Sequence, residues 1–250
     1  MDNNPQYRNV GNLGDILKHA ALVSLTKIAI RKAKKKLTYI DTHAFMLSAP
    51  CPNPDEWHRI IRSVFAAHES YQDYFMLERH IMENKPYRCS SGLTLDLLST
   101  SGISYCAFLY EKDSQTRKTL KQQLHSEGQE HCEVISDALT IATLKLPPEI
   151  DTLLMLVDPF NKLDDELWNA VSKALCNYVN SGIEVIVQVF TYDKNSDAIQ
   201  WREAPHPIGK PCAHISRQPF HLAVYSMKGL NKDVTQCCQA LGWHINGNEL

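Results

Sequence analysis

Short apolar runs alternate with helix-like segments along most of the chain. Five runs have the length and composition of strands that are buried on both faces, namely 37–43, 104–111, 132–137, 152–158 and 183–190. Four segments between them have the polar and apolar pattern of helices, namely 13–34, 92–100, 114–125 and 165–180. Strands that alternate with helices predict right-handed βαβ units and a mostly parallel sheet. We therefore expect an α/β protein with a Rossmann-like fold.

Two regions depart from this alternation. The segment at 55–85 is polar and aromatic, with apolar residues at helical spacing and no convincing strand. We interpret 50–90 as a helical insertion after the first strand, within a single domain that spans 1–250. Four prolines at 204–219 indicate a long loop, which a last strand at 220–226 follows.

The helix predicted at 13–34 has one clear apolar stripe. This stripe consists of Leu17, Ala21, Leu25 and Ile28. Lys18 and His19 lie on the first turns of the helix, away from the stripe.

Four of the apolar runs end on a carboxylate. These acids are Asp41, Glu111, Asp137 and Asp158. Ligands of an open α/β sheet bind beyond the carboxyl ends of its strands, so the four acids would surround one site. An unpaired carboxylate beside a hydrophobic strand is costly, so a polar group should meet each of them. The alternative, that they are helix N-caps or loop acids, suits any one position but explains all four poorly.

The net charge of the 250-residue chain is only −2, but the charge is unevenly distributed. Among the first 40 residues, eight cations oppose two acids and leave a net charge of +6; the cations are Arg8, Lys18, Lys27, Arg31, Lys32, Lys34, Lys35 and Lys36. Such a cluster indicates either a polyanionic partner or a solvated helix end whose cations complement the helix dipole.

Cysteine usage and hydropathy suggest a compartment. The eight cysteines include no C-x-x-C pair and no ligand-like spacing with histidine, so we expect reduced thiols and no metal site. The chain has no apolar stretch near 18 residues, and its first residues do not resemble a signal peptide. We expect a cytoplasmic protein with no membrane partner, and a monomer by default.

The residues at the ends of the predicted strands limit the classes of reaction that the protein could catalyse. The first strand is followed by His43 without a glycine-rich turn, and the chain has no G-x-x-x-x-G-K-[ST] motif. Both absences disfavour a dinucleotide-dependent oxidoreductase and a P-loop ATPase. Glu111 is well placed to accept from ribose hydroxyls and Asp137 from an adenine amino group. Asp158 is the catalytic candidate, because its carboxylate and the ring of Phe160 suit a flat base with an exocyclic amine.

Two sequence blocks carry a specific resemblance. The first is GNLGDILKH at Gly11–His19, and the second is YIDTHA at Tyr39–Ala44. They resemble the G-N-x-x-D-x-L-K-H and D-T-H-A-G-A-G motifs of the bacterial 23S ribosomal RNA adenine-N6 methyltransferases called large-subunit methyltransferase J. Counterparts of that family's Y-P-G-S-P and D-P-P-Y motifs follow in the same order, so the resemblance extends over about 7–230. It implies a Rossmann-like S-adenosylmethionine methyltransferase fold.

The resemblance also implies roles for individual residues. Asp158 matches the catalytic aspartate. The residues implied to border S-adenosylmethionine are His19, His43, Ser90, Glu111, Asp137 and Ala138. Tyr7 and Lys18 match positions near the RNA substrate, and Phe160, within the counterpart of D-P-P-Y, is expected to contact the substrate base. The resemblance thus implies ribosomal RNA as partner and N6-methylation of an adenine as the reaction.

The chain also departs from the family motifs, always on the ligand side. The glycines after D-T-H-A are replaced by Phe45-Met46-Leu47, and D-P-P-Y has become Asp158-Pro159-Phe160-Asn161. Y-P-G-S-P has lost its glycine and prolines to Arg88, Cys89 and Ser91. Glycine lets the backbone approach a ligand closely, so bulky replacements would fill a cofactor pocket. The alternative hypothesis is therefore a catalytically impaired relative that acts as an RNA-binding protein.

Overall fold

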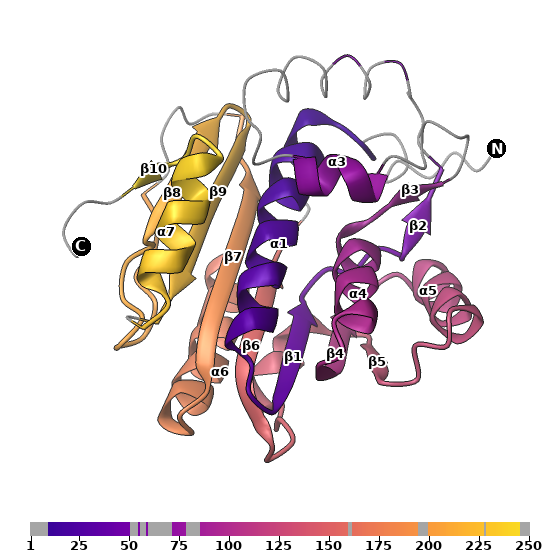
Figure 1. Cartoon of the computed structure of the whole chain (residues 1–250), viewed down its shortest axis with the longest axis horizontal. Coiled ribbons are helices and arrows are strands. Elements are labelled where there is room, and N and C mark those ends of the chain that lie inside the picture. Colours follow the sequence, from indigo (N-terminus) through magenta and orange to yellow (C-terminus); the bar gives the residue numbers. More distant parts are fainter. Residues whose placement is uncertain are drawn as a thin grey trace.

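An eight-stranded sheet with helices on both faces forms the centre of the described structure (Figure 1). The computed structural model describes residues 10–50, 55, 59, 72–78, 86–159, 162–194, 200–227 and 229–245. The eight-stranded sheet has the order β10-β8-β9-β7-β6-β1-β4-β5. Its strands are β1 (Lys36–Asp41), β4 (Ser104–Tyr110), β5 (Cys132–Ile135), β6 (Ile150–Val157), β7 (Glu184–Tyr192), β8 (Ala213–Arg217), β9 (Phe220–Ser226) and β10 (His244–Ile245).

Five of these strands are parallel, so their carboxyl ends meet at one edge of the sheet. β1 pairs with β4 on one side and β6 on the other, and β5 and β7 extend the parallel set. β9, β8 and β10 complete the sheet through antiparallel pairings. Because the strand order reverses direction at β1, the crevice beyond β1 and β6 is where such sheets bind ligands.

Each face of the sheet has its own hydrophobic core. Leu154 and Leu156 of β6 pack toward one face, whereas Leu153, Met155 and Val157 pack toward the other. The first face is covered by α1 (Leu13–Lys32), α4 (Ser90–Thr100), α5 (Ser114–Ser126) and α7 (Asn231–Ala240). The second is covered by α6 (Asp165–Asn180) and the 3-10 helix η4 (Ala138–Thr143). The runs are apolar on both sides because both faces are buried.

The burial of α1 is more complete than its stripe predicted. Besides the stripe, Ile16, Lys18 and His19 are buried, because α1 is covered by the sheet, α4, α7 and α3 (Gln72–Glu78). The predicted helix is confirmed, with bounds that agree within two residues, but residues off the apolar stripe are buried as well. Asn12 caps the helix, accepting a hydrogen bond from Asp15 N at 3.0 Å.

Most predicted elements are confirmed, with one clear error. The prolines at 204–219 suggested a continuous loop, but 213–217 form β8, which pairs with β9 as a hairpin. Pro211 and Pro219 lie just outside this strand, where the missing N–H of proline costs no hydrogen bond of the sheet.

Among the described residues, no helix has the length and hydropathy needed to cross a bilayer.

The predicted insertion at 50–90 lies largely outside the described residues. Within it, α3 is helical, and β3 (Tyr87–Arg88) pairs antiparallel with β2 (Ser48–Ala49). The insertion as a unit, like the single domain, stays a prediction.

Candidate functional site

Two adjoining cavities lie at the carboxyl edge of the sheet, and His43 lines both. The first, about 460 Å³, contains Asp158 and is called the Asp158 cavity. The second, about 1020 Å³, contains Glu111 and is called the Glu111 cavity. Pro159 of the D-P-F-N segment lines the Glu111 cavity, so consecutive residues border the two spaces. Both volumes fall in or near the usual range of ligand pockets, roughly 300–1000 Å³.

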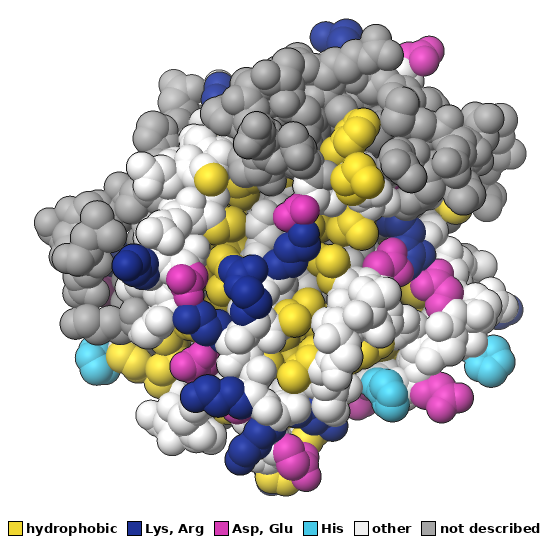
Figure 2. Space-filling view, viewed as in Figure 1, with side chains coloured by type: hydrophobic (Ala, Val, Ile, Leu, Met, Phe, Trp, Pro, Cys, Tyr) yellow, Lys and Arg dark blue, Asp and Glu magenta, His cyan; other side chains and the backbone are white. Residues whose placement is uncertain are grey.

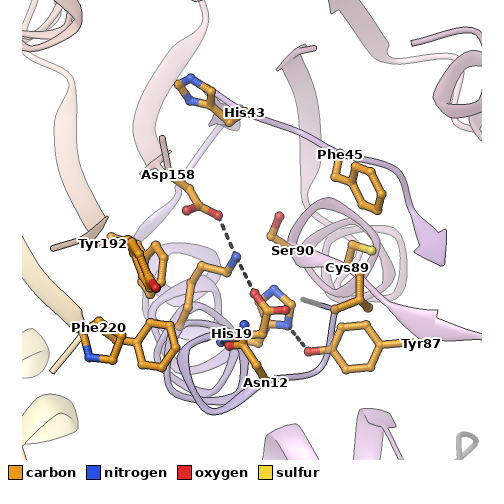
Figure 3. A pocket seen from close by; sticks show the side chains of 15 residues that line it. Asn12, His19, His43, Phe45, Tyr87, Cys89, Ser90, Asp158, Tyr192 and Phe220 are labelled. Atoms are coloured by element: carbon orange, nitrogen blue, oxygen red, sulfur yellow. Dashed lines mark hydrogen bonds and ion pairs between the residues drawn. The ribbon is translucent and has the colours of Figure 1, made fainter. Parts of the chain in front are cut away.

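Asp158 is paired with a lysine from α1. Lys18 Nζ lies 2.6 Å from Asp158 Oδ2 and 3.0 Å from Asp15 Oδ1 (Figure 3). Asp15 also accepts a hydrogen bond from Gly11 N at 2.9 Å, so its carboxylate fixes the residues just before α1 to the first turn of the helix. The first motif block thus places one lysine between two carboxylates, and its buried charges compensate one another.

The charge state of this group follows from burial and pairing. Burial raises the pKa of Asp158 to about 6, although the ion pair with Lys18 opposes the shift. Burial alone would lower the pKa of Lys18, but Asp15 and Asp158 outweigh it and raise this pKa above its ordinary value. Asp158 is therefore an anion near neutral pH and an acid below about pH 6, while Lys18 stays charged throughout.

His19 is a neutral hydrogen-bonding group. Its Nδ1 lies 2.8 Å from the Tyr87 hydroxyl, which is 3.2 Å from the hydroxyl of Tyr74. Burial, together with the nearby Lys18 charge, lowers the pKa of His19 to about 3. His19 lines the Asp158 cavity as predicted, and it connects α1 to β3 and α3.

The segment that replaces the family's glycines does not fill the site. Met46 and Leu47 are buried in the hydrophobic core, and only Phe45 lines the Asp158 cavity. Ala44 N donates to Tyr110 O at 2.8 Å, and Leu47 N donates to Gln123 Oε1 at 2.8 Å. The side chains of Met46 and Leu47 are turned away from the Asp158 cavity, and Phe45 forms part of its wall.

Asp41 does not line either cavity, contrary to the prediction that four acids surround one site. It is fully buried, and its Oδ2 accepts from Tyr39 Oη at 3.0 Å, Ser90 Oγ at 2.9 Å and Ser91 Oγ at 3.0 Å. Its Oδ1 accepts from His43 N at 3.1 Å. Asp41 positions the strand end and the start of α4 beneath the cavities. The acid needed polar partners, as predicted, but the protein supplies them itself.

The replacement of the family's prolines creates a buried arginine network. Arg88 donates to Asp96 Oδ2 at 3.0 Å, to Glu127 Oε1 at 2.9 Å and to Ser48 Oγ at 2.8 Å. A Cβ on Gly92 would collide with the carbonyl oxygen of Leu47, so α4 begins in close contact with the loop after β1. This network holds Ser90, the first residue of α4, at the wall of the Asp158 cavity.

The Glu111 cavity brings together the residues predicted to hold a nucleoside. Glu111 is buried, and Oε1 accepts from Asp113 N at 2.7 Å. Burial raises the pKa of Glu111 to about 7. Asp137 is exposed and caps η4, accepting from Leu139 N at 2.9 Å, and Ala138 follows it. The N-cap alternative therefore holds for Asp137, whose carboxylate nonetheless lines the cavity.

The structure thus brings together eight of the ten predicted site residues. Lys18, His19, Ser90 and Asp158 line one cavity, Glu111, Asp137 and Ala138 line the other, and His43 borders both. Tyr7 and Phe160 lie outside the described residues. The single site expected from the sequence is thus divided into two cavities that meet at His43. The Nδ1 of His43 lies 2.8 Å from Thr42 Oγ1. The roles of the ten predicted site residues toward a ligand stay predictions.

Sequence reasoning missed four residues that line the Asp158 cavity. Asp15 was available as the D of the G-N-x-x-D block, but its pairing with Lys18 was not inferred. Phe190, Tyr192 and Phe220 also line this cavity, from β7 and β9. No motif marked these aromatic residues, because they come together only through the pairing of the two strands.

Apart from Lys18, the described cations of the first 40 residues line neither cavity. Lys27 pairs with Asp73 at 2.6 Å and Lys32 with Asp233 at 2.5 Å. At 1.5 Å per residue, Lys32 is roughly 20 Å along α1 from Lys18. Figure 2 shows cationic and acidic side chains interspersed over this face. The described cations therefore favour a solvated helix end over a continuous basic patch.

Comparison with known proteins gives structural relatives only. No family model and no curated protein matches the chain. Protein LPL1258 of Legionella pneumophila, from the family DUF519, is similar with a TM-score of 0.62 and 16% identity over 91% of each chain. An S-adenosylmethionine-dependent methyltransferase from Aquifex aeolicus has a TM-score of 0.44 and 8% identity over 90% of this chain and 100% of its own. An rRNA methylase from Streptococcus thermophilus has a TM-score of 0.39 and 10% identity over 81% and 93%.

The fold is therefore established. The chain has a Rossmann-like α/β fold with a mostly parallel sheet, as predicted. Its doubly wound sheet, with β9 reversed beside β7, and its similarity to LPL1258 along nearly the whole chain carry this conclusion.

Proposed function

We propose that this protein is an S-adenosylmethionine-dependent methyltransferase that modifies the N6 amino group of an adenine in 23S ribosomal RNA. The observation that carries the proposal is the half-buried carboxylate of Asp158 in an open cavity that adjoins, at His43, a second cavity containing Glu111. The substrate assignment rests on the resemblance of Gly11–His19 and Tyr39–Ala44 to the adenine-N6 methyltransferase motifs.

The Glu111 cavity fits the nucleoside part of the cofactor. A buried carboxylate at the end of β4 is suited to accept from two ribose hydroxyls, and Asp137-Ala138 borders the space where an adenine would lie. His43 and Ser90 then border the methionine part, in the Asp158 cavity. When bound, S-adenosylmethionine supplies an electrophilic methyl group.

The task of Asp158 is to hold an aromatic amine. Its carboxylate accepts a hydrogen bond from the amino group, which orients the nitrogen lone pair toward the methyl group. Lys18 keeps this carboxylate ionised and fixed, since a buried anion without a cation would take up a proton. Asp15 holds the lysine in turn.

An active enzyme is favoured over the impaired relative. That alternative expected the residues replacing the glycine loop to occupy the pocket. Met46 and Leu47 pack in the core, and Phe45 borders the Asp158 cavity, which keeps a volume of about 460 Å³. The test is incubation of the purified protein with labelled S-adenosylmethionine and an unmodified 23S RNA transcript. Nucleoside analysis should yield N6-methyladenosine. RNA binding without any methylated nucleoside would support the impaired relative instead.

Removing the charge of Glu111 should weaken cofactor binding. Glu111→Gln keeps the size of the side chain but replaces one acceptor oxygen by a donor. We expect the dissociation constant for S-adenosylmethionine to rise about 10- to 100-fold, the effect of losing one or two hydrogen bonds to a charged group. Calorimetry measures it. Because the pKa of Glu111 is raised to about 7, wild-type affinity should fall as the pH drops below 7, and the variant should lose this dependence.

The rate at saturating cofactor and RNA should depend on pH through Asp158. Its pKa is raised to about 6, so the active carboxylate is lost as the pH falls through 6. We expect kcat to be half-maximal near pH 6 and constant above about pH 7. Burial lowers the pKa of His19 to about 3, so His19 does not account for this limb. A rate that stays constant from pH 5 to 8 would contradict the assignment.

A further inference from the structure

We infer that Phe190, Tyr192 and Phe220, together called the aromatic wall, form the surface on which the target base stacks. All three line the Asp158 cavity, and Tyr192 and Phe220 lie on the same side of it as Asp158 (Figure 3). The inference rests on the proposed function for its substrate, a base that carries an amino group. It goes further by naming the residues that hold the ring.

The three rings form one continuous surface. The ring centroids of Phe190 and Phe220 are 6.0 Å apart with an interplanar angle of 27°, and those of Tyr192 and Phe220 are 5.8 Å apart at 56°. Tyr192 ends β7 and pairs with Phe220, the first residue of β9. The antiparallel pairing therefore brings the rings to the same edge of the sheet as Asp158.

A glycine in α1 makes room for this wall. A Cβ on Gly14 would lie 2.5 Å from Phe220 Cδ1 and 2.9 Å from its Cγ, distances that real side chains do not tolerate. The Phe220 ring thus lies directly against the backbone of the first turn of α1. Asp15 directly follows Gly14. The same turn of α1 therefore contacts the aromatic wall and forms the ion pair with Lys18.

The chemistry of the cavity selects its occupant. Lys18 Nζ is 5.2 Å from the centre of the Phe190 ring and 2.6 Å from Asp158 Oδ2, so the aromatic surface and the carboxylate meet at one point. A flat heteroaromatic ring with an amino group can stack on the wall and donate to Asp158 at the same time. A sugar or an aliphatic amine would use the carboxylate alone.

The aromatic wall also offers a replacement for the tyrosine that the counterpart of D-P-P-Y lacks. Asn161 stands where the resembled motif has its tyrosine, so that position supplies no aromatic ring. Aromatic residues on β7 and β9 can provide the stacking instead, because they border the same cavity as Asp158.

The test is saturation-transfer NMR with adenosine monophosphate as the probe. Saturating S-adenosylhomocysteine is present, so that the probe cannot use the cofactor site. Phe220→Leu removes the ring but keeps much of its volume, and Gly14→Ala displaces the ring while leaving it in the chain. Alanine is otherwise the better helix residue, so the second variant should fold. Tyr105→Leu is the matched control, because its ring lies near the start of β4 and lines neither cavity.

We expect transfer to the adenine H2 and H8 protons to fall at least five-fold in both variants and to be unchanged in the control. The KM for the 23S transcript should rise roughly 10-fold, the effect of one lost stacking contact. Transfer that is unchanged in folded Phe220→Leu, or equally reduced in Tyr105→Leu, would overturn the inference. Methylation of the transcript but not of free adenosine monophosphate would identify RNA, rather than a nucleotide, as the source of the base.

The proposed function can fail separately. If S-adenosylhomocysteine gave no binding heat, the methyltransferase proposal would be lost. The dependence of adenosine monophosphate transfer on Phe220 would still decide whether the aromatic wall holds a base.

Discussion

Replacing Asp158 by asparagine should abolish almost all methyl transfer. The amide keeps the shape of the side chain, but it removes the anion that accepts from the target amine and offers a donor near it. We expect kcat to fall by about 10²- to 10³-fold, the usual effect of removing one preorganised electrostatic group from an active site. Transfer of labelled methyl groups to the 23S transcript under saturating conditions measures the loss.

The variant should remain folded and bind its cofactor. Lys18 keeps Asp15 as a partner at 3.0 Å, so Asp158→Asn leaves no unpaired cation. Cofactor affinity should change less than three-fold, because Glu111 lies in the other cavity. Retention of more than a third of wild-type kcat would remove Asp158 from the reaction and favour the RNA-binding alternative.

Replacing Lys18 by methionine should destabilise the protein strongly. The change leaves Asp15 and Asp158 buried without their cation, and breaking a buried pair in this way costs about 3–5 kcal/mol. Lys27→Met is the matched control, because Lys27 lies on the same helix and pairs with Asp73 at 2.6 Å in a partly exposed position. That substitution should cost less than about 1 kcal/mol. Urea unfolding at pH 7.5 compares the two.

The loss at Lys18 should depend on pH in a defined direction. Without the cation, the pKa of Asp158 in the folded protein rises further above its unfolded value. The folded variant then binds more protons than the unfolded chain between these two values, so its stability falls as the pH rises through this window. The difference from wild type should be smallest near pH 5 and largest above pH 7, and the kcat limb should move to higher pH. Equal losses for Lys18→Met and Lys27→Met at every pH would contradict the pairing.

The sheet could be predicted from the sequence because its signals are local. Apolar runs buried on both faces, separated by helical periodicity, identify β1, β4, β5, β6 and β7 within a few residues. Parallel strands end at one edge, so the acids that follow them were expected to lie close together. This reasoning located Glu111, Asp137 and Asp158 at that edge. The family resemblance added Lys18, which no periodicity marks as functional.

The parts that escaped prediction depend on contacts between distant segments. Asp41 is buried because hydroxyls from Ser90 and Ser91, about 50 residues away, satisfy it. The lysine that pairs with Asp158 is 140 residues away, and Phe220 reaches the cavity only because β8 and β9 form a hairpin against β7. The prolines around β8 concealed that hairpin. No local pattern contains this information.

A crystal structure of the protein with S-adenosylhomocysteine tests most directly whether the two cavities are one catalytic site. We expect the ribose hydroxyls within hydrogen-bond distance of Glu111, the adenine beside Asp137-Ala138, and the sulfur past His43 in the cavity of Asp158. A ligand bound elsewhere, or a structure in which saturating ligand leaves both cavities empty, would contradict the proposed methyl transfer.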